Sequence, residues 1–196
     1  MQSLKIGFGI CGSFCTFHRI IPVMERLAAA GHEITPIMSA AAYFTDTRFG
    51  KCEEINRKIT EICGKEIIHE LKTAEPIGPK KLFDVMAVAP CTGNTLAKIA
   101  CGITDTPAAL CVKSHLRNGR PVVLAVSTND GLGQSAKNIG ALLPAKHIFF
   151  VPFRQDDWVK KPNSVVADFD CIPDTVENAL ENRQIQPVLR QIQTER

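Results

Sequence analysis

The residues of this sequence that could do chemistry lie in polar turns that directly follow apolar runs. The clearest turn carries Thr92, Asn94 and Thr95, just after the apolar run 85–89 and Pro90. Two hydroxyls and a carboxamide at that place can hydrogen bond to a ligand, or Asn94 or Thr95 can instead cap the following helix. Open α/β sheets bind ligands at the carboxyl ends of their strands. We therefore expect this turn, with Pro90, to contact a ligand.

A second turn, near the start of the chain, has the composition of an anion site. Gly9, Gly12 and Ser13 follow the first apolar run, and Ser39 follows the second. A serine after a glycine at a helix N-terminus offers backbone N–H groups, a hydroxyl and the positive end of the helix dipole to an anion. We expect these four residues to bind a phosphate; the alternative for each serine is a plain helix N-cap.

The same turn also spells the dinucleotide fingerprint G-x-G-x-x-G, with Gly7, Gly9 and Gly12. That fingerprint requires an acidic residue at the end of the second strand to bind a ribose hydroxyl. Here Glu33 stands at the beginning of that strand and Ser39 follows its end. The pattern therefore favours a phosphate over a dinucleotide, and direct NAD(P) binding is the weaker alternative.

A third polar loop, residues 127–133, follows the buried-type run 121–126. We expect its Ser127 and Asn129 to face the same ligand as the first two turns, because parallel strands end at one edge of a sheet. His69 is a candidate acid or base, although a lone histidine is more often structural.

The elements that must position these turns alternate between apolar runs and amphipathic segments. This alternation predicts a doubly wound, Rossmann-like three-layer αβα fold with a mostly parallel sheet of about six strands. The expected strands are 4–10, 33–38, 66–68, 85–89, which Pro90 would end, 121–126 and 148–151. Residues 1–151 would form the α/β domain, and residues 152–196 a docking segment and a helix of the same domain, starting at Asp174.

Composition excludes several classes of function. The chain has 196 residues, a formal net charge of +3 and 6% aromatic residues, which does not suggest a nucleic-acid binder. No apolar run approaches the roughly 20 residues that cross a bilayer, and the first residues lack a signal peptide, so we expect a cytoplasmic protein without membrane contact. The eight cysteines show no C-x-x-C spacing, so we expect reduced thiols and no metal site.

Three of these motifs together resemble a known family. Residues 9–13, Ser39 and residues 89–98 resemble the flavoproteins that include homo-oligomeric flavin-containing cysteine decarboxylases and flavin prenyltransferases, over roughly residues 4–151. The resemblance implies an FMN pocket at an interface between identical subunits. It places the phosphate near Gly12, Ser13 and Ser39, and the flavin ring near Pro90, Thr92, Asn94 and Thr95.

Further runs, residues 73–80, 127–131 and 151–157, resemble one branch of that family. The members of this branch are the B subunits of a two-subunit oxidoreductase that acts on a small cyclic dicarboxylate. The resemblance implies a partner A subunit that carries the NADP site. Arg154 and Lys80 are candidates to bind substrate carboxylates, because arginine in particular matches them bidentately.

Two departures from the decarboxylases leave alternatives open. This chain has Gly93 where decarboxylases usually have alanine, and residues 127–130 replace their Pro-Ala-Met-Asn type of motif. One alternative is a flavin-dependent decarboxylase with His69 as base, which the missing motif disfavours. The other is a non-catalytic scaffold that keeps only an anion site, which the loss of a side chain at Gly93 favours.

Overall fold

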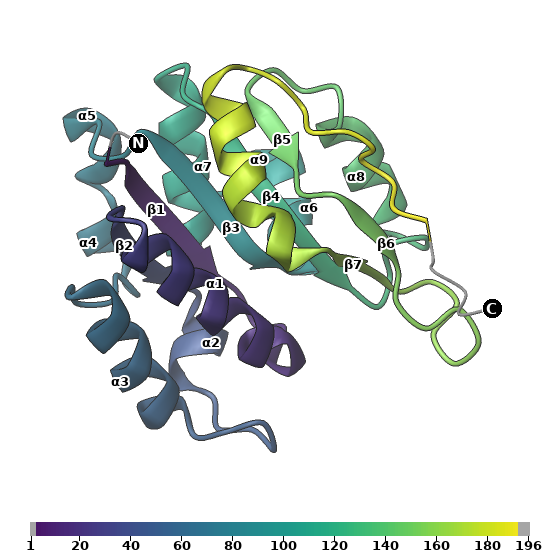
Figure 1. Cartoon of the computed structure of the whole chain (residues 1–196), viewed down its shortest axis with the longest axis horizontal. Helices are drawn as coiled ribbons and strands as arrows, with labels where there is room; N and C mark the ends of the chain where they lie inside the picture. Colours follow the sequence, from purple (N-terminus) through teal and green to yellow (C-terminus); the bar gives the residue numbers. More distant parts are fainter. Residues whose placement is uncertain (1–2, 192–196) are drawn as a thin grey trace.

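Seven strands form one mostly parallel sheet in the order β2-β1-β3-β4-β7-β6, with β5 paired to β4 (Figure 1). The structure is a computed structural model that describes residues 3–191. The predicted three-layer α/β class is confirmed. The strands are β1 (Lys5–Ile10), β2 (Glu33–Met38), β3 (Val85–Cys91), β4 (Val122–Thr128), β5 (Ile148–Phe150), β6 (Phe153–Gln155) and β7 (Val165–Ala167).

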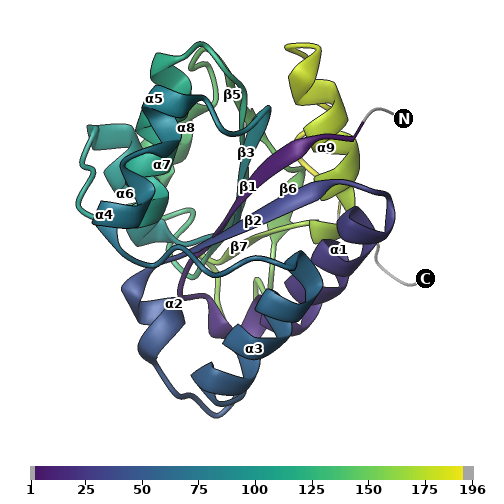
Figure 2. The ribbon, with the colours of Figure 1, turned by 90° about the vertical axis from the view of Figure 1, so that its left-hand side faces the viewer.

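The helices cover both faces of this sheet, as Figure 2 shows. One layer holds α1 and α9, which contact each other, with α3 beside α1; the other holds α4 to α8. The helices are η1 (Phe14–Thr16), α1 (Phe17–Ala29), α2 (Ala40–Phe44), α3 (Cys52–Cys63), α4 (Leu71–Ala74), α5 (Ile77–Lys80), α6 (Gly93–Cys101), α7 (Pro107–Arg117), α8 (Ala136–Leu142), η2 (Phe169–Cys171) and α9 (Ile172–Leu180).

The central strands explain why the apolar runs lack alternation. All seven residues of β3 are buried, as are the first six of β4. A strand covered by helices on both faces buries its side chains in both directions, which selects continuous apolar sequence. Pro90 does not end β3; it lies where the register shifts between Val88 and Cys91.

The segment after residue 152 joins the same sheet instead of only docking on it. β6 and β7 form an antiparallel pair, and β7 continues the sheet by pairing with the end of β4. After α9 the chain runs back to the sheet. There the Gln184 side chain hydrogen bonds to both the backbone N–H and the backbone carbonyl of Phe150 in β5, each at 2.7 Å. Trp158 of the expected docking segment is 48% exposed on the loop between β6 and β7. Residues 192–196 of the expected C-terminal segment lie outside the described part of the chain.

Two local expectations were wrong. Residues 66–68 make a single bridge, Ile37 to Ile68, instead of a strand. Two short helices, α4 and α5, follow this bridge. Helix α9 begins at Ile172 with a proline in its first turn, so Asp174 lies inside the helix and does not cap it.

Between residues 3 and 191, no helix is both long and apolar enough to span a membrane. The same part of the chain contains no cluster of three or more histidine, cysteine or acidic side chains suited to a metal ion. All eight cysteines are free thiols, as expected.

Candidate functional site

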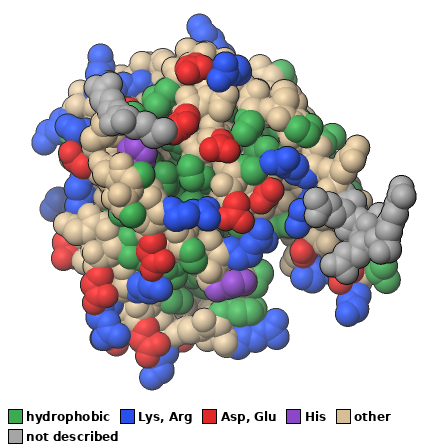
Figure 3. Space-filling model, viewed as in Figure 1, with side chains coloured by type: hydrophobic (Ala, Val, Ile, Leu, Met, Phe, Trp, Pro, Cys, Tyr) green, Lys and Arg blue, Asp and Glu red, His purple; other side chains and the backbone are tan. Residues whose placement is uncertain are grey.

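A cavity of about 750 Å³ opens beside the carboxyl ends of β1, β3 and β4. Figure 3 shows a hollow between the body of the molecule and the β6–β7 loop, with a histidine at its rim. The volume is that of a small-molecule site. The cavity is lined by Gly12, Ser13, Phe14, Cys15, Thr16, His18, Arg19, Phe49, Thr92, Gly93, Ser127, Thr128, Asn129, Asp130, Asp156, Lys161, Ser164, Val165 and Val166.

Two of the predicted serines meet in this cavity. The Ser13 and Ser127 hydroxyl oxygens lie 2.9 Å apart and share a hydrogen bond, although the residues are 114 positions apart in the sequence. Ser13 makes no side-chain capping bond to η1, so its hydroxyl is not used as an N-cap. Paired hydroxyls at the ends of β1 and β4 therefore offer donors to an anion.

The turn after β1 adds backbone N–H groups to these hydroxyls. Phe14 and Cys15 open η1, and no backbone carbonyl between residues 3 and 191 accepts from their N–H groups. Unpaired amides at the start of a helical segment attract anions, since their partial positive charges point outward. The end of β1 thus has the donor set that phosphate oxygens require.

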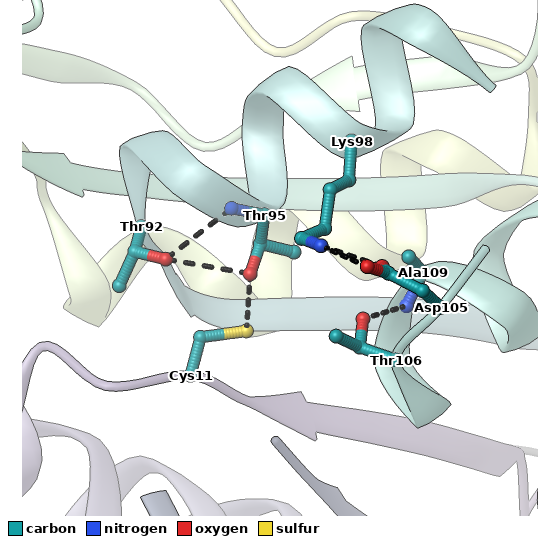
Figure 4. A network of polar contacts seen from close by, with 7 residues as sticks. All are labelled: Cys11, Thr92, Thr95, Lys98, Asp105, Thr106 and Ala109. Carbon is teal, nitrogen blue, oxygen red and sulfur yellow. Dashed lines mark hydrogen bonds and ion pairs between the residues drawn. The ribbon is translucent and has the colours of Figure 1, made fainter. Parts of the chain in front are cut away.

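The turn after β3 is held by its own hydrogen bonds (Figure 4). Thr92, and not Asn94 or Thr95, is the N-cap of α6, and its hydroxyl accepts from the Thr95 amide at 3.4 Å. The Thr95 hydroxyl donates to the Cys11 sulfur at 3.2 Å. Burial raises the pKa of Cys11 to about 11, so this thiol stays protonated at neutral pH. Thr92 lines the cavity, whereas buried Thr95 connects the turn to the end of β1.

Four other predicted site residues lie outside the cavity lining. Gly9 and Pro90 are buried within their strands, and Asn94 is exposed on α6. Ser39 is the N-cap of α2 and accepts from the Ala42 amide at 3.2 Å. In this single chain the cavity therefore collects Gly12, Ser13, Thr92, Ser127 and Asn129 from the predicted set.

The candidate catalytic and substrate-binding residues are also elsewhere. The His69 ring stacks on Tyr43, with the ring centroids 3.8 Å apart, and its Nδ1 atom lies 3.1 Å from the Ile67 carbonyl oxygen. Arg154 is exposed on β6, and Lys80 is exposed at the end of α5. None of the three lines the cavity.

Comparison with known proteins identifies the family. The family model described as Flavoprotein matches residues 1–170. The chain belongs to the flavoprotein family. It is 46% identical over 192 residues to the B subunit of dipicolinate synthase from Bacillus subtilis (strain 168), with 96% of each chain covered. Within the flavoproteins, the chain thus groups with the B subunits of dipicolinate synthase.

Solved flavoproteins share the fold. The crystal structure of the B subunit of dipicolinate synthase from Bacillus halodurans C is 45% identical, covers 96% of both chains and gives a TM-score of 0.88. Burkholderia xenovorans DmrB, solved in complex with FMN, is 16% identical, covers 92% of this chain and 97% of its own, and gives a TM-score of 0.67. At this lower identity the likeness shows the fold alone.

Several cavity residues of this flavoprotein were not predicted as site residues. Thr128 and Asp130 stand beside Ser127 and Asn129 in the sequence, so their position in the same polar loop was the available signal. Arg19 and Lys161 come from α1 and the β6–β7 loop. No local pattern marks these two cations, because only the folded sheet brings the two segments together.

Two glycines of the triplet, Gly7 and Gly9, serve packing inside the sheet of this flavoprotein. A Cβ atom on Gly7 would lie 2.4 Å from Phe83 Cδ2 and 2.8 Å from Met86 Sδ. A Cβ atom on Gly9 would lie 3.1 Å from Met86 Cε. These glycines are therefore explained by close neighbours in the core, and the dinucleotide interpretation loses its main support.

Replacing Gly7 with alanine is expected to lower the free energy of unfolding by about 2 kcal/mol, because overpacking a core typically costs ~1–3 kcal/mol. Chemical denaturation measures this change. Gly140→Ala is the matched control, since a Cβ atom there has no neighbour within 4 Å and alanine favours helix α8. Adding Phe83→Leu to the Gly7 variant should restore part of the loss; an unchanged stability in Gly7→Ala would contradict the packing argument.

Gly93 is likewise required by its neighbours. A Cβ atom at this position would lie 2.8 Å from both the Ser135 and the Thr128 hydroxyl oxygens. The glycine lets the start of α6 approach the β4–α8 loop closely. Its presence therefore has a packing reason and gives no support to a scaffold that has lost its flavin site.

Proposed function

We propose that this chain is the flavin-binding B subunit of a dipicolinate synthase, which acts with the A subunit to oxidise dihydrodipicolinate to dipicolinate during sporulation. The observation that carries this proposal is the 46% identity over nearly the whole chain to the B subunit from Bacillus subtilis. Its site is the cavity at the strand ends, and its place of action is the cytoplasm of the sporulating mother cell.

The residues of the cavity fit FMN. The Ser13 and Ser127 hydroxyls, 2.9 Å apart, and the unpaired amides of Phe14 and Cys15 form a compact donor set for the phosphate. Thr92 and Asn129 supply further polar groups around the same space. A bound flavin would supply an acceptor for two electrons, and the protein would supply binding and orientation.

The partner subunit completes the proposed activity. Aromatisation of a dihydropyridine removes a hydride and a proton from the ring. In this proposal NADP, bound on the A subunit, takes up the hydride, and the proton is released to water. The role of this chain is to hold the flavin and the dicarboxylate in a pocket that excludes bulk water.

We further propose that identical copies of this chain close the open side of the cavity. The cavity opens to the surface, and Phe49 at its rim is 49% exposed. Asn94 is exposed and lies outside the cavity lining, so it cannot contact FMN bound in the cavity of its own chain. It would contact the FMN of a neighbouring copy. Light scattering of the FMN-loaded chain tests this assembly; a monomer with bound flavin would contradict it.

The visible absorption spectrum of the purified chain, recorded with and without added FMN, tests the function. We expect the chain to shift the spectrum of FMN and quench its fluorescence. We also expect the chain to increase the NADP-dependent formation of dipicolinate by the purified A subunit, followed by ultraviolet absorption. A chain that neither binds FMN nor changes the rate of the A subunit would refute the proposal.

The two alternatives give different results in the same assays. A decarboxylase would release carbon dioxide from peptidyl-cysteine or phosphopantothenoylcysteine, and we expect none, because His69 lies outside the cavity. A scaffold would be colourless after purification and would not bind added FMN, but it would still activate the A subunit.

A further inference from the structure

Arg19 is a cation without an acidic partner at the wall of the cavity. Its guanidinium carbon lies 4.8 Å from the centroid of the Phe169 ring, and the side chain is partly buried. No ion pair formed by residues 3–191 includes Arg19. This cation–π contact with Phe169 restricts the guanidinium while leaving its N–H groups without an acidic partner.

Lys161 is the second cation of the cavity and comes from another element. It lies on the β6–β7 loop, where its backbone N–H group donates to Asp157 and its carbonyl accepts from Ser164. Its ammonium group is 3.5 Å from Asp156, and both side chains are about half exposed, at 51% and 43%. Such an exposed pair contributes little stability, so Lys161 can turn to a ligand at small cost.

The two acids of the cavity leave Arg19 unpaired and hold Lys161 only through an exposed ion pair. Asp130 accepts a hydrogen bond from the Gln134 amide at 3.1 Å, before the start of α8. Asp156 is the partner of Lys161 and is exposed. Neither carboxylate pairs with Arg19.

The cations and the proposed phosphate donors differ in chemistry and in the elements that carry them. The neutral hydroxyls of Ser13 and Ser127 and the amides of the β1–η1 turn form one group at the end of the sheet. Arg19 on α1 and Lys161 on the β6–β7 loop line the same cavity and carry full positive charges. A mononucleotide phosphate uses the first group and leaves the second group free.

From this arrangement we infer that Arg19 and Lys161, which come from two different elements of the cavity wall, bind the two carboxylates of a planar cyclic dicarboxylate. This inference rests on the proposed function, since it assigns the substrate-binding residues of the same site. It replaces Arg154 and Lys80 in that role, because neither lines the cavity. The arginine fork binds one carboxylate bidentately, and the ammonium group binds the other as a point charge.

Calorimetric titration with pyridine-2,6-dicarboxylate and pyridine-2-carboxylate tests the inference. The titrations use the full chain saturated with FMN, first by itself and then together with the A subunit. Arg19→Gln and Lys161→Gln should each weaken binding of the dicarboxylate tenfold or more, since hydrogen bonds between charged groups contribute about 1.5–3 kcal/mol. Both variants should also lose the preference of the wild type for two carboxylates over one.

Two matched substitutions control for charge. Arg26→Gln removes another arginine of α1, one that pairs with Asp170, and Lys160→Gln removes the lysine next to Lys161; neither residue lines the cavity. Both should bind the dicarboxylate as the wild type does. The affinity for FMN should stay within threefold of the wild-type value in all four variants. Their thermal unfolding temperatures should also be unchanged.

The results separate this inference from the proposed function. If Arg19→Gln weakens FMN and leaves the dicarboxylate unchanged, Arg19 serves the phosphate and the inference is overturned. Absence of dicarboxylate binding in both the chain and the complex overturns it as well. If the wild type binds no FMN but binds the dicarboxylate through Arg19, the inference stands and the flavin part of the proposed function fails.

Discussion

Replacing Ser13 with aspartate is expected to weaken FMN binding at least a hundredfold while leaving the fold intact. The new carboxylate would stand beside the Ser127 hydroxyl, where the phosphate is proposed to bind. Two like charges about 4 Å apart repel by roughly 4 kcal/mol at an effective dielectric of 20, and a hundredfold loss corresponds to about 2.7 kcal/mol. Fluorescence titration with FMN measures the change.

Riboflavin, which lacks the phosphate, is the decisive probe for this variant. Its affinity should be nearly the same in wild type and Ser13→Asp, because the repulsion acts on the phosphate alone. Ser13→Ala removes one neutral hydrogen bond and should weaken FMN by less than tenfold, since such a bond contributes about 1 kcal/mol. An equal loss of riboflavin and FMN affinity would place Ser13 away from the phosphate.

Lowering the pH is expected to destabilise the protein through His115, a buried residue of α7 that is 3% exposed. Burial, followed by the nearby Arg120 charge, lowers the pKa of His115 from 6.5 to about 4, and its Nε2 atom has no hydrogen-bond partner among the described residues. Asp84 acts in the opposite direction but does not compensate. The native state therefore holds this imidazole neutral in the range where the unfolded chain protonates it.

The direction of the effect follows from this difference in pKa. Above pH 6.5 His115 is neutral in both states, and its contribution to stability is complete. As the pH falls from 6.5 towards 4, the unfolded chain binds the proton first, so the free energy of unfolding decreases by about 2–3 kcal/mol. Below pH 4 both states are protonated and the loss levels off.

Urea unfolding at pH 7.5 and pH 4.5 measures this loss. His115→Phe should lose about 2–3 kcal/mol less stability than the wild type over that interval. Both proteins contain the same carboxylates, so the contribution of these groups cancels in the comparison. His18→Gln, which removes an exposed histidine, should behave as the wild type. If His115→Phe and wild type lose stability in parallel, the buried imidazole does not carry the effect.

The fold was predictable because its signals are local. The unbroken apolar runs of β3 and β4 reflect burial on both faces, and the residues that end each helix stand next to it in the sequence. The last strands were missed because β6 and β7 have only three residues each, too few to show a period. They form only because the end of β4 offers a free edge.

Half of the proposed site could be found from the sequence. Ser13, Thr92, Ser127 and Asn129 lie at or just beyond the carboxyl ends of strands, and parallel strands end at one edge of the sheet, so their meeting could be predicted. Ser39 and Asn94 follow the same rule but lie outside the cavity, since the direction of the turn after a strand depends on tertiary packing.

The layered fold, the family and the hydroxyl-rich strand ends could be read from the amino-acid sequence, because local patterns of neighbouring residues encode them. The hydrogen bond between Ser13 and Ser127, the packing of Phe83 against Gly7, and the shared cavity of Arg19 and Lys161 became visible only in the folded chain. Contacts between residues more than seventy positions apart leave no spacing pattern in a single sequence, since the order of the strands and the packing of the helices set them.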